Sequence, residues 1–256
     1  MWGKIAVLLA VLLTLVGCQR EQPAYESRYT EPPATTVAER PTFDVTSVNT
    51  ALSGTQPYTV SVLGDSTGNW INEWVHLVAQ RIAAAYERQV TVHDWNPDSG
   101  EYGRDTVYGQ GAPVTIWNAA GPGESTQWSI QNFQEQVPGP VDLTIINHGH
   151  NDPKGAVSGI DRLIGMSFRK GTGGVVVLTQ NPRIDEPGRA QLEADTYTQI
   201  RDEFNNPNRG TVVVDVFAAF PQGDALLPLL ERDRVHPNEA GSRLWADAVA
   251  TGLQLR

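Results

Sequence analysis

The chain has 256 residues, a length that suits one domain with an additional segment. Its composition, 40% hydrophobic and 19% charged residues, is that of an ordinary globular protein. The net charge of −10 argues against non-specific binding to nucleic acid or to an anionic membrane surface, and the single cysteine excludes an intramolecular disulfide and a cysteine metal cluster.

Residues 1–17 are predicted to be an export signal. Lys4 precedes an apolar run over residues 5–16, which is too short to span a bilayer as a helix but fits the core of a signal peptide. The LVGC sequence at residues 15–18 resembles a bacterial lipobox, in which the cysteine is lipidated and becomes the mature N-terminus. We therefore expect a lipid anchor at Cys18 that holds an exported protein on the cell membrane facing the envelope. Secretion after cleavage nearby is the alternative.

Residues 18–56 are rich in Pro, Thr, Glu and Ser and show little hydrophobic periodicity. Such a composition predicts an extended tether. The folded domain is accordingly predicted to span residues 57–256, with part of residues 42–52 packed at its edge.

From Tyr58 onward, strand patterns alternate with helical patterns, which predicts a parallel sheet covered by helices on both faces. Strands are expected at residues 59–63, 89–92, 114–117, 141–147 and 175–179, with a sixth at 211–216. Helices are expected from about residue 69 to 88, at 125–137, after Asp152, at 188–204 and at 237–253. Residues 93–113, dense in Gly, Asp and aromatic residues, are predicted to form a long loop. The result is a three-layer α/β/α sandwich on a mainly parallel sheet of five or six strands.

Polar motifs follow three of these strands, and a fourth precedes the last helix. They are GDS at residues 64–66, NAAGPG at 118–123, GHND at 149–152 and DRVHPN at 233–238. Because the carboxyl ends of parallel strands lie along one edge of a sheet, segments far apart in sequence can meet there.

In this order the four motifs resemble the sequence blocks of the SGNH hydrolases, also called GDSL esterases or lipases. The resemblance runs from about Thr59 to the end of the chain and implies a flavodoxin-like fold, serine esterase activity and no cofactor or metal. It implies that Ser66 is the nucleophile and that Asp233 and His236 complete a catalytic triad.

The same resemblance implies an oxyanion hole. Its donors would be the backbone amides of Ser66 and Gly123 and the side chain of Asn151, with Gly121 as the alternative to Gly123. The chemistry needs these residue types, because a serine hydroxyl attacks well only when a histidine takes its proton and an aspartate holds that histidine. Amide donors stabilise the negative charge that develops on the ester oxygen.

The other histidines and the acidic residues have weaker signals. His150 is predicted to contact substrate, because loops beside a site often do so. Trp128, together with the aromatic 93–113 segment, is predicted to line a sugar or acyl site. His76 is expected to be structural, and His93 and His148 receive no role. Four acidic residues of the 93–113 segment fit no calcium-loop spacing and are expected to be solvated; they are Asp94, Asp98, Glu101 and Asp105.

Several functions remain open at this stage. SGNH hydrolases remove acetyl groups from sugars or acyl chains from lysophospholipids, or cleave thioesters and simple esters. An envelope anchor would bring cell-wall polysaccharide, peptidoglycan and lipid esters within reach, and of these we prefer small acyl groups on glycans or glycolipids. The alternatives are a lysophospholipase or lipase and a non-catalytic envelope-anchored binding lipoprotein; phosphodiester hydrolysis is less favoured. GDSTG also matches the nucleophile elbow of α/β-hydrolases, but only one predicted strand precedes Ser66, whereas that fold places several there. We expect a monomer.

Overall fold

The computed structural model describes residues 40–256, so the predicted signal peptide and Cys18 lie outside the described residues. The described part is built on a seven-stranded sheet with the order β3-β2-β4-β1-β5-β6-β7. The strands are β1 (Tyr58–Gly64), β2 (Arg88–Asn96), β3 (Glu101–Tyr108), β4 (Ala112–Ala120), β5 (Leu143–Asn147), β6 (Val175–Leu178) and β7 (Thr211–Val214). All neighbours pair in parallel except β2 and β3, which are antiparallel. The predicted mainly parallel sheet is confirmed, with one strand more than the larger number expected.

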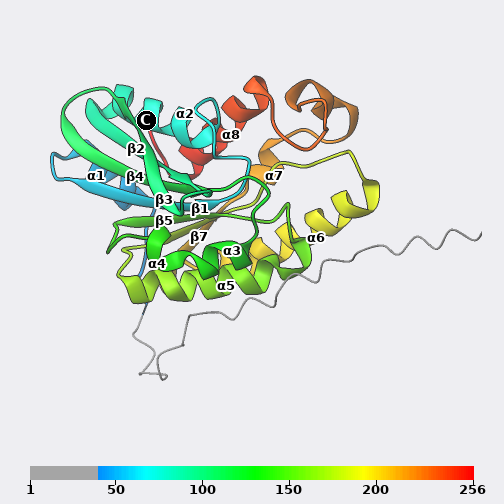
Figure 1. The fold of residues 1–256 in the computed structure, drawn as a ribbon, viewed down its shortest axis with the longest axis horizontal. Coiled ribbons are helices and arrows are strands. Elements are labelled where there is room, and N and C mark those ends of the chain that lie inside the picture. Colours follow the sequence, from blue (N-terminus) through cyan, green and yellow to red (C-terminus); the bar gives the residue numbers. More distant parts are fainter. Residues whose placement is uncertain (1–39) are drawn as a thin grey trace, which may run out of the picture. The chain divides into compact units, whose positions relative to one another are not determined.

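Helices cover both faces of the sheet and complete the three layers. They are α1 (Thr46–Ser53), α2 (Trp74–Tyr86), α3 (Thr126–Gln131), α4 (Phe133–Gln136), α5 (Pro153–Lys170), α6 (Pro187–Phe204), α7 (Val216–Ala219) and α8 (Glu239–Gly252), with short 3-10 helices at Pro207–Arg209 and Gly223–Leu229. Figure 1 shows α2 and α8 on one face of the sheet and α3, α5 and α6 on the other. Within residues 40–256, none of the helices has the length and apolar character needed to cross a bilayer.

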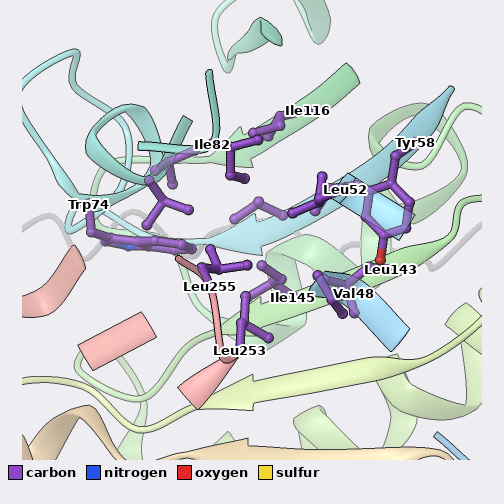
Figure 2. A pocket seen from close by; sticks show the side chains of 14 residues that line it. Val48, Leu52, Tyr58, Trp74, Ile82, Ile116, Leu143, Ile145, Leu253 and Leu255 are labelled. Carbon is purple, nitrogen blue, oxygen red and sulfur yellow. The ribbon is translucent and has the colours of Figure 1, made fainter. Parts of the chain in front are cut away.

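The core beneath α2 is closely packed and apolar. Figure 2 shows side chains from α1, α2, the central strands and the C-terminal residues Leu253 and Leu255 lining one small pocket. The void that they enclose has a volume of about 20 Å³. A space of this size holds no ligand larger than water. This layer therefore supports the sheet and leaves the ligand site to the strand ends.

Part of the 42–52 segment packs on the domain, as expected, so the folded domain begins before residue 57, where the tether was predicted to end. Phe43, Val48 and Leu52 are buried in the same core as α2 and β1. Helix α1 was missed because it has only eight residues, with Val48, Ala51 and Leu52 among Thr, Ser and Asn, which is too short to establish a helical repeat.

Residues 93–113 form a β-hairpin rather than the predicted long loop. They supply the end of β2, a turn and the whole of β3, which lies at the sheet edge and is mostly exposed. His93 stacks on Trp117 of β4 with ring centroids 4.2 Å apart, and Tyr102 meets Trp117 edge-on at 4.9 Å. An exposed edge strand shows no apolar alternation, so its sequence reads as a loop.

Two helix boundaries also differ from the prediction, and one is confirmed. Helix α2 begins at Trp74 instead of near residue 69, and the predicted 125–137 helix is interrupted at Asn132. Helix α5 starts as predicted, because the Asp152 side chain accepts a hydrogen bond from the Gly155 amide at 3.1 Å and proline opens the first turn.

Candidate active site

Three side chains from two distant motifs form one hydrogen-bonded row. Ser66 lies in the turn directly after β1, and its Oγ is 2.8 Å from Nε2 of His236. Nδ1 of His236 is 2.6 Å from Oδ2 of Asp233. The structure thus brings together the predicted nucleophile, base and acid in the order that serine hydrolysis requires.

The loop before α8 holds Asp233 in place through its own backbone. Oδ1 of Asp233 accepts hydrogen bonds from the amides of Val235 and His236 at 2.9 and 3.0 Å. Partial burial opposes ionisation of Asp233, but the hydrogen bonds from the His236 ring and from these two amides outweigh it, so its pKa lies below the ordinary value. Asn238 then caps α8 by accepting from the amides of Ala240 and Gly241.

The turn that carries Ser66 is braced from below by Asp65. This buried carboxylate accepts from the amide and hydroxyl of Thr67 at 3.1 and 2.8 Å, and from the Gln180 side chain at 2.7 Å. Asp65 therefore orders the nucleophile turn from inside.

The loops that carry the predicted oxyanion donors are joined to one another. The Gly121 amide donates to the Gly64 carbonyl at 3.1 Å, so it is occupied and does not serve as the alternative donor. Gly123 has φ of 75°, a conformation that glycine adopts without strain, and its amide makes no hydrogen bond with the described residues. The Asn151 side chain is exposed and donates to the Glu124 carbonyl at 2.8 Å, next to Gly123.

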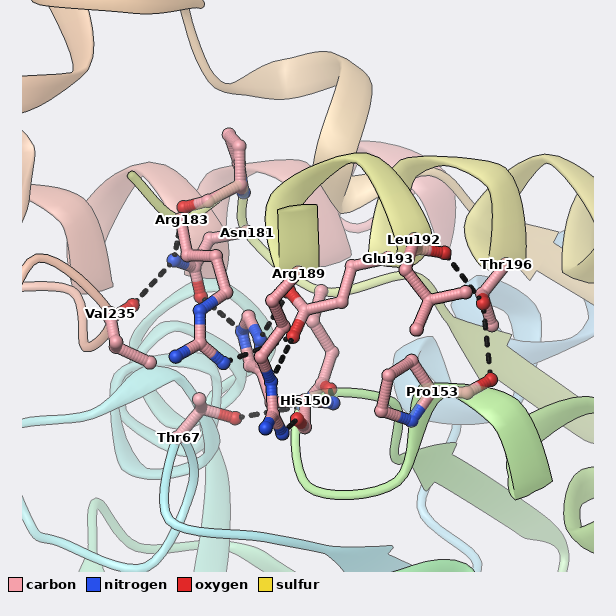
Figure 3. A network of polar contacts seen from close by, with 12 residues as sticks. Thr67, His150, Pro153, Asn181, Arg183, Arg189, Leu192, Glu193, Thr196 and Val235 are labelled. Carbon is pink, nitrogen blue, oxygen red and sulfur yellow. Dashed lines mark hydrogen bonds and ion pairs between the residues drawn. The ribbon is translucent and has the colours of Figure 1, made fainter. Parts of the chain in front are cut away.

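His150 does not face the place where a substrate would lie. The residue is only 3% exposed, with Nδ1 3.0 Å from Oε2 of Glu193 and Nε2 3.1 Å from Oδ1 of Asn181 (Figure 3). The prediction that His150 contacts substrate disagrees with this geometry, because both ring nitrogens are engaged inside the domain. Trp128 is half-buried with its ring near Gly121, beside the oxyanion loop, and its contact with substrate stays a prediction.

The remaining histidines are structural. His148 is fully buried with Nε2 2.8 Å from the Ser129 hydroxyl, and burial lowers its pKa to about 4, which keeps the ring neutral. His76 lies inside α2 with Nε2 3.0 Å from Asp94, in agreement with its predicted role. His93 lies on β2 and pairs with the exposed Asp105 at 2.6 Å.

Asp94 is buried, which corrects the expectation that it belongs to a solvated loop. It is 7% exposed and accepts hydrogen bonds from the side chains of Arg104 and Asn118. Asn118, the first residue of the second motif, also donates to the Gly68 carbonyl at 2.9 Å. This contact links the sheet edge to the segment that follows Ser66.

Several residues of the site region carried no motif and were missed. Gln180 and Asn181 follow β6, and Glu193 lies in the second turn of α6. Polar residues directly after a buried strand were a usable signal for Gln180 and Asn181, because they share the sheet edge with Ser66. Glu193 had no local signal.

An open depression of about 400 Å³ lies beside Asn151, between the first turns of α5 and α6. Its lining mixes charged and apolar groups: Asn151, Asp152, Pro153, Lys154, Glu186, Gly188, Arg189 and Leu192. Among residues 40–256 there is no group of three or more His, Cys, Asp or Glu side chains arranged to hold a metal ion.

Comparison with known proteins shows the fold. No protein-family model matches the sequence, and no curated protein matches it.

Solved structures do match. An acetylxylan esterase from Geobacillus stearothermophilus has 16% identity and a TM-score of 0.54 over 78% of this chain and 95% of that one. A member of the lipolytic protein G-D-S-L family from Veillonella parvula has 17% identity and a TM-score of 0.53 over 76% and 97%. A lipase/acylhydrolase from Enterococcus faecalis has 16% identity and a TM-score of 0.52 over 76% and 94%. The described domain therefore has an SGNH-type fold.

Proposed function

We propose that this protein is a serine esterase that hydrolyses carboxylic esters with Ser66 as nucleophile. The observation that supports this most is the unbroken row from the Ser66 hydroxyl through the His236 ring to the Asp233 carboxylate, at 2.8 and 2.6 Å. A row of this kind has a direct chemical use, because it raises the reactivity of one hydroxyl at the open edge of the sheet.

In the proposed reaction, His236 takes the Ser66 proton while Oγ attacks the ester carbonyl carbon. The amides of Ser66 and Gly123 and the Asn151 side chain stabilise the oxyanion, and one such donor contributes about 3–4 kcal/mol. When the carbon–oxygen bond to the alcohol breaks, His236 returns the proton to the leaving alcohol. Water, deprotonated by His236, then attacks the acyl-enzyme, and the carboxylic acid leaves as Ser66 regains its proton.

We propose small acyl groups on cell-envelope glycans or glycolipids as the substrates. The depression beside Asn151 is open and partly lined by charged groups, which suits a hydrated sugar better than a long acyl chain. The acetylxylan esterase among the structural neighbours is named for an acetylated sugar substrate. Export with a lipid anchor at Cys18 would bring the enzyme to such substrates. A lipase-type specificity is the second candidate, favoured by the neighbour named lipase/acylhydrolase.

The test compares wild-type protein with Ser66→Ala on p-nitrophenyl esters of increasing chain length and on acetylated glycans. We expect Ser66→Ala to lower kcat by about 10³-fold or more, because the residual rate then comes from binding and the oxyanion donors alone. A steep preference for acetate is expected, whereas a preference for long chains would support the lipase alternative.

Ser61→Ala is the matched control, because Ser61 is buried on β1, the strand that leads to Ser66, and its hydroxyl has no partner among the described residues. It should leave kcat nearly unchanged. Equal activity of wild type and Ser66→Ala, or inactivity of both in folded protein, would point to a binding lipoprotein instead.

A further inference from the structure

His150 is enclosed by groups that determine where its protons lie. It stands between β5 and α5, directly before Asn151, and its two ring nitrogens face Glu193 and Asn181 (Figure 3). A histidine with two engaged nitrogens is either neutral, with one donor and one acceptor, or an imidazolium with two donors. The partners decide between these states.

Asn181 needs a proton on Nε2 of His150. The Asn181 amide nitrogen lies 2.8 Å from two carbonyl oxygens, those of Pro182 and Val235. Carbonyl oxygens only accept, so the NH₂ group must face them and Oδ1 must face the ring. Oδ1 can only accept, and Nε2 must therefore donate.

Glu193 needs a proton on Nδ1. Its carboxylate is 1% exposed, and Oε1 faces Nη1 of Arg183 at 3.1 Å and Nε of Arg189 at 3.4 Å. Two guanidinium groups that donate to a buried carboxylate stabilise its negative charge. Oε2 then accepts from Nδ1, and His150 carries a proton on both nitrogens.

The surrounding charges agree with a positive ring. His150, Arg183 and Arg189 are faced by three carboxylates, those of Glu193, Asp65 and Asp185, the last bound to Arg183. Burial alone would lower the pKa of His150, but the hydrogen bond and charge of Glu193, the charge of Asp65 and the Asn181 contact together raise it. Tyr197 packs edge-on to the ring with centroids 6.4 Å apart.

This arrangement connects the two halves of the candidate site. On one side the backbone of His150 continues into Asn151, and its amide donates to Gln180, which also holds Asp65 beneath the nucleophile turn. On the other side Asn181 holds the Val235 carbonyl, between Asp233 and His236. We propose that His150 is a permanently charged positioning residue. As a buried imidazolium, it fixes the position of Asn151, the side-chain donor of the oxyanion hole, relative to the loop that carries Asp233 and His236. Its catalytic consequence rests on the proposed esterase function.

The charge state is tested without any assay of activity. Protein containing ¹⁵N-labelled histidine is followed by NMR from pH 6 to 9, with His93→Gln and His150→Gln to assign the ring signals. We expect both His150 nitrogens to stay protonated at pH 8 in the wild type. In Glu193→Gln the ring should lose a proton at a lower pH than in the wild type. A wild-type His150 that is neutral at pH 7 would overturn the proposal, whether or not the protein is an esterase.

The positioning role is tested by kinetics on p-nitrophenyl acetate. We expect Glu193→Gln and His150→Gln to lower kcat about tenfold or more with KM changed less than twofold, because displaced donors act on the transition state. The kcat of Glu193→Gln should fall further as pH rises through the lowered pKa of His150, whereas wild type should not show this fall. His93→Gln, a matched change of a histidine paired with Asp105, should leave kcat unchanged. The positioning role would be overturned if the Glu193→Gln variant kept the kcat of the wild type at a pH where its His150 ring is neutral.

Discussion

Asp233 carries its negative charge through contacts that its own loop supplies. One carboxylate oxygen receives two backbone amides and the other receives the His236 ring. The pKa of Asp233 is lowered by these bonds in spite of partial burial, so the carboxylate is ionised wherever an esterase of this kind would work. The proton on Nδ1 of His236 is thereby held toward Asp233, which leaves Nε2 to accept from Ser66.

Asp233→Asn should lower kcat for p-nitrophenyl acetate by about 10³–10⁴-fold, because an amide favours the wrong tautomer of His236. Since the pKa of Asp233 is lowered on folding, its contribution to stability is present above its unfolded pKa of about 3.9 and is lost as pH falls through the folded value. The free energies of unfolding of the wild type and of Asp233→Asn, measured with urea, should thus differ at pH 7 and become equal in strong acid.

Asp247→Asn is the control for this change, because Asp247 is exposed and contacts only the partly exposed Arg81 in the described structure. More than a tenth of wild-type kcat in Asp233→Asn would contradict the role assigned to the carboxylate.

At the scale of elements, Arg88 joins α1 to the sheet. It is 1% exposed and donates to six backbone carbonyls, namely those of Ala51, Leu52, Gly54, Gln56, Ala112 and Pro113. Four of these lie in the end of α1 and the segment before β1, and two lie at the start of β4. One side chain thus satisfies carbonyls that a helix end would otherwise leave without a donor.

Arg88→Met should lower the free energy of unfolding by about 3 kcal/mol or more, because it leaves several buried carbonyls without donors. Urea unfolding monitored by tryptophan fluorescence measures the change. Arg81→Met, which removes a partly exposed ion pair, should cost less than about 1 kcal/mol. Equal effects of the two substitutions would contradict the role of Arg88.

At the scale of the whole described domain, residues 40–56 belong to the core. Phe43 lies against Gly174, the residue directly before β6, while Val48 and Leu52 pack in the layer beneath α2. Each such side chain stabilises the fold by about 1.5–3 kcal/mol when buried. Their sum is comparable with the net stability of a typical domain.

A protein that begins at residue 57 should therefore unfold at a much lower temperature than one that begins at residue 40, or fail to fold. Circular dichroism during heating of the two proteins tests this. Identical unfolding temperatures of the two proteins would show that α1 does not contribute to the stability of the domain, as a tether that extends to residue 56 implies.

Much of the fold could be predicted from the local pattern of apolar and polar residues in the sequence. The central strands are runs of β-branched and apolar residues that end in polar motifs, so their positions and the motifs at their ends were predicted to within a few residues. Strand β3 was missed because both of its faces are largely exposed, and α1 because a helix of eight residues with three apolar positions is too short to establish a repeat.

The sequence by itself determined which hydroxyl follows β1, which motifs end the strands and in what order they occur, because each of these is a property of neighbouring residues. Only the tertiary structure decided that His150 turns inward to Glu193, that Asp94 is buried and that Arg88 donates to the carbonyls at the end of α1. The reason is physical. A buried polar group must find its partner, and the partners here are brought close only when the sheet and its helices pack together.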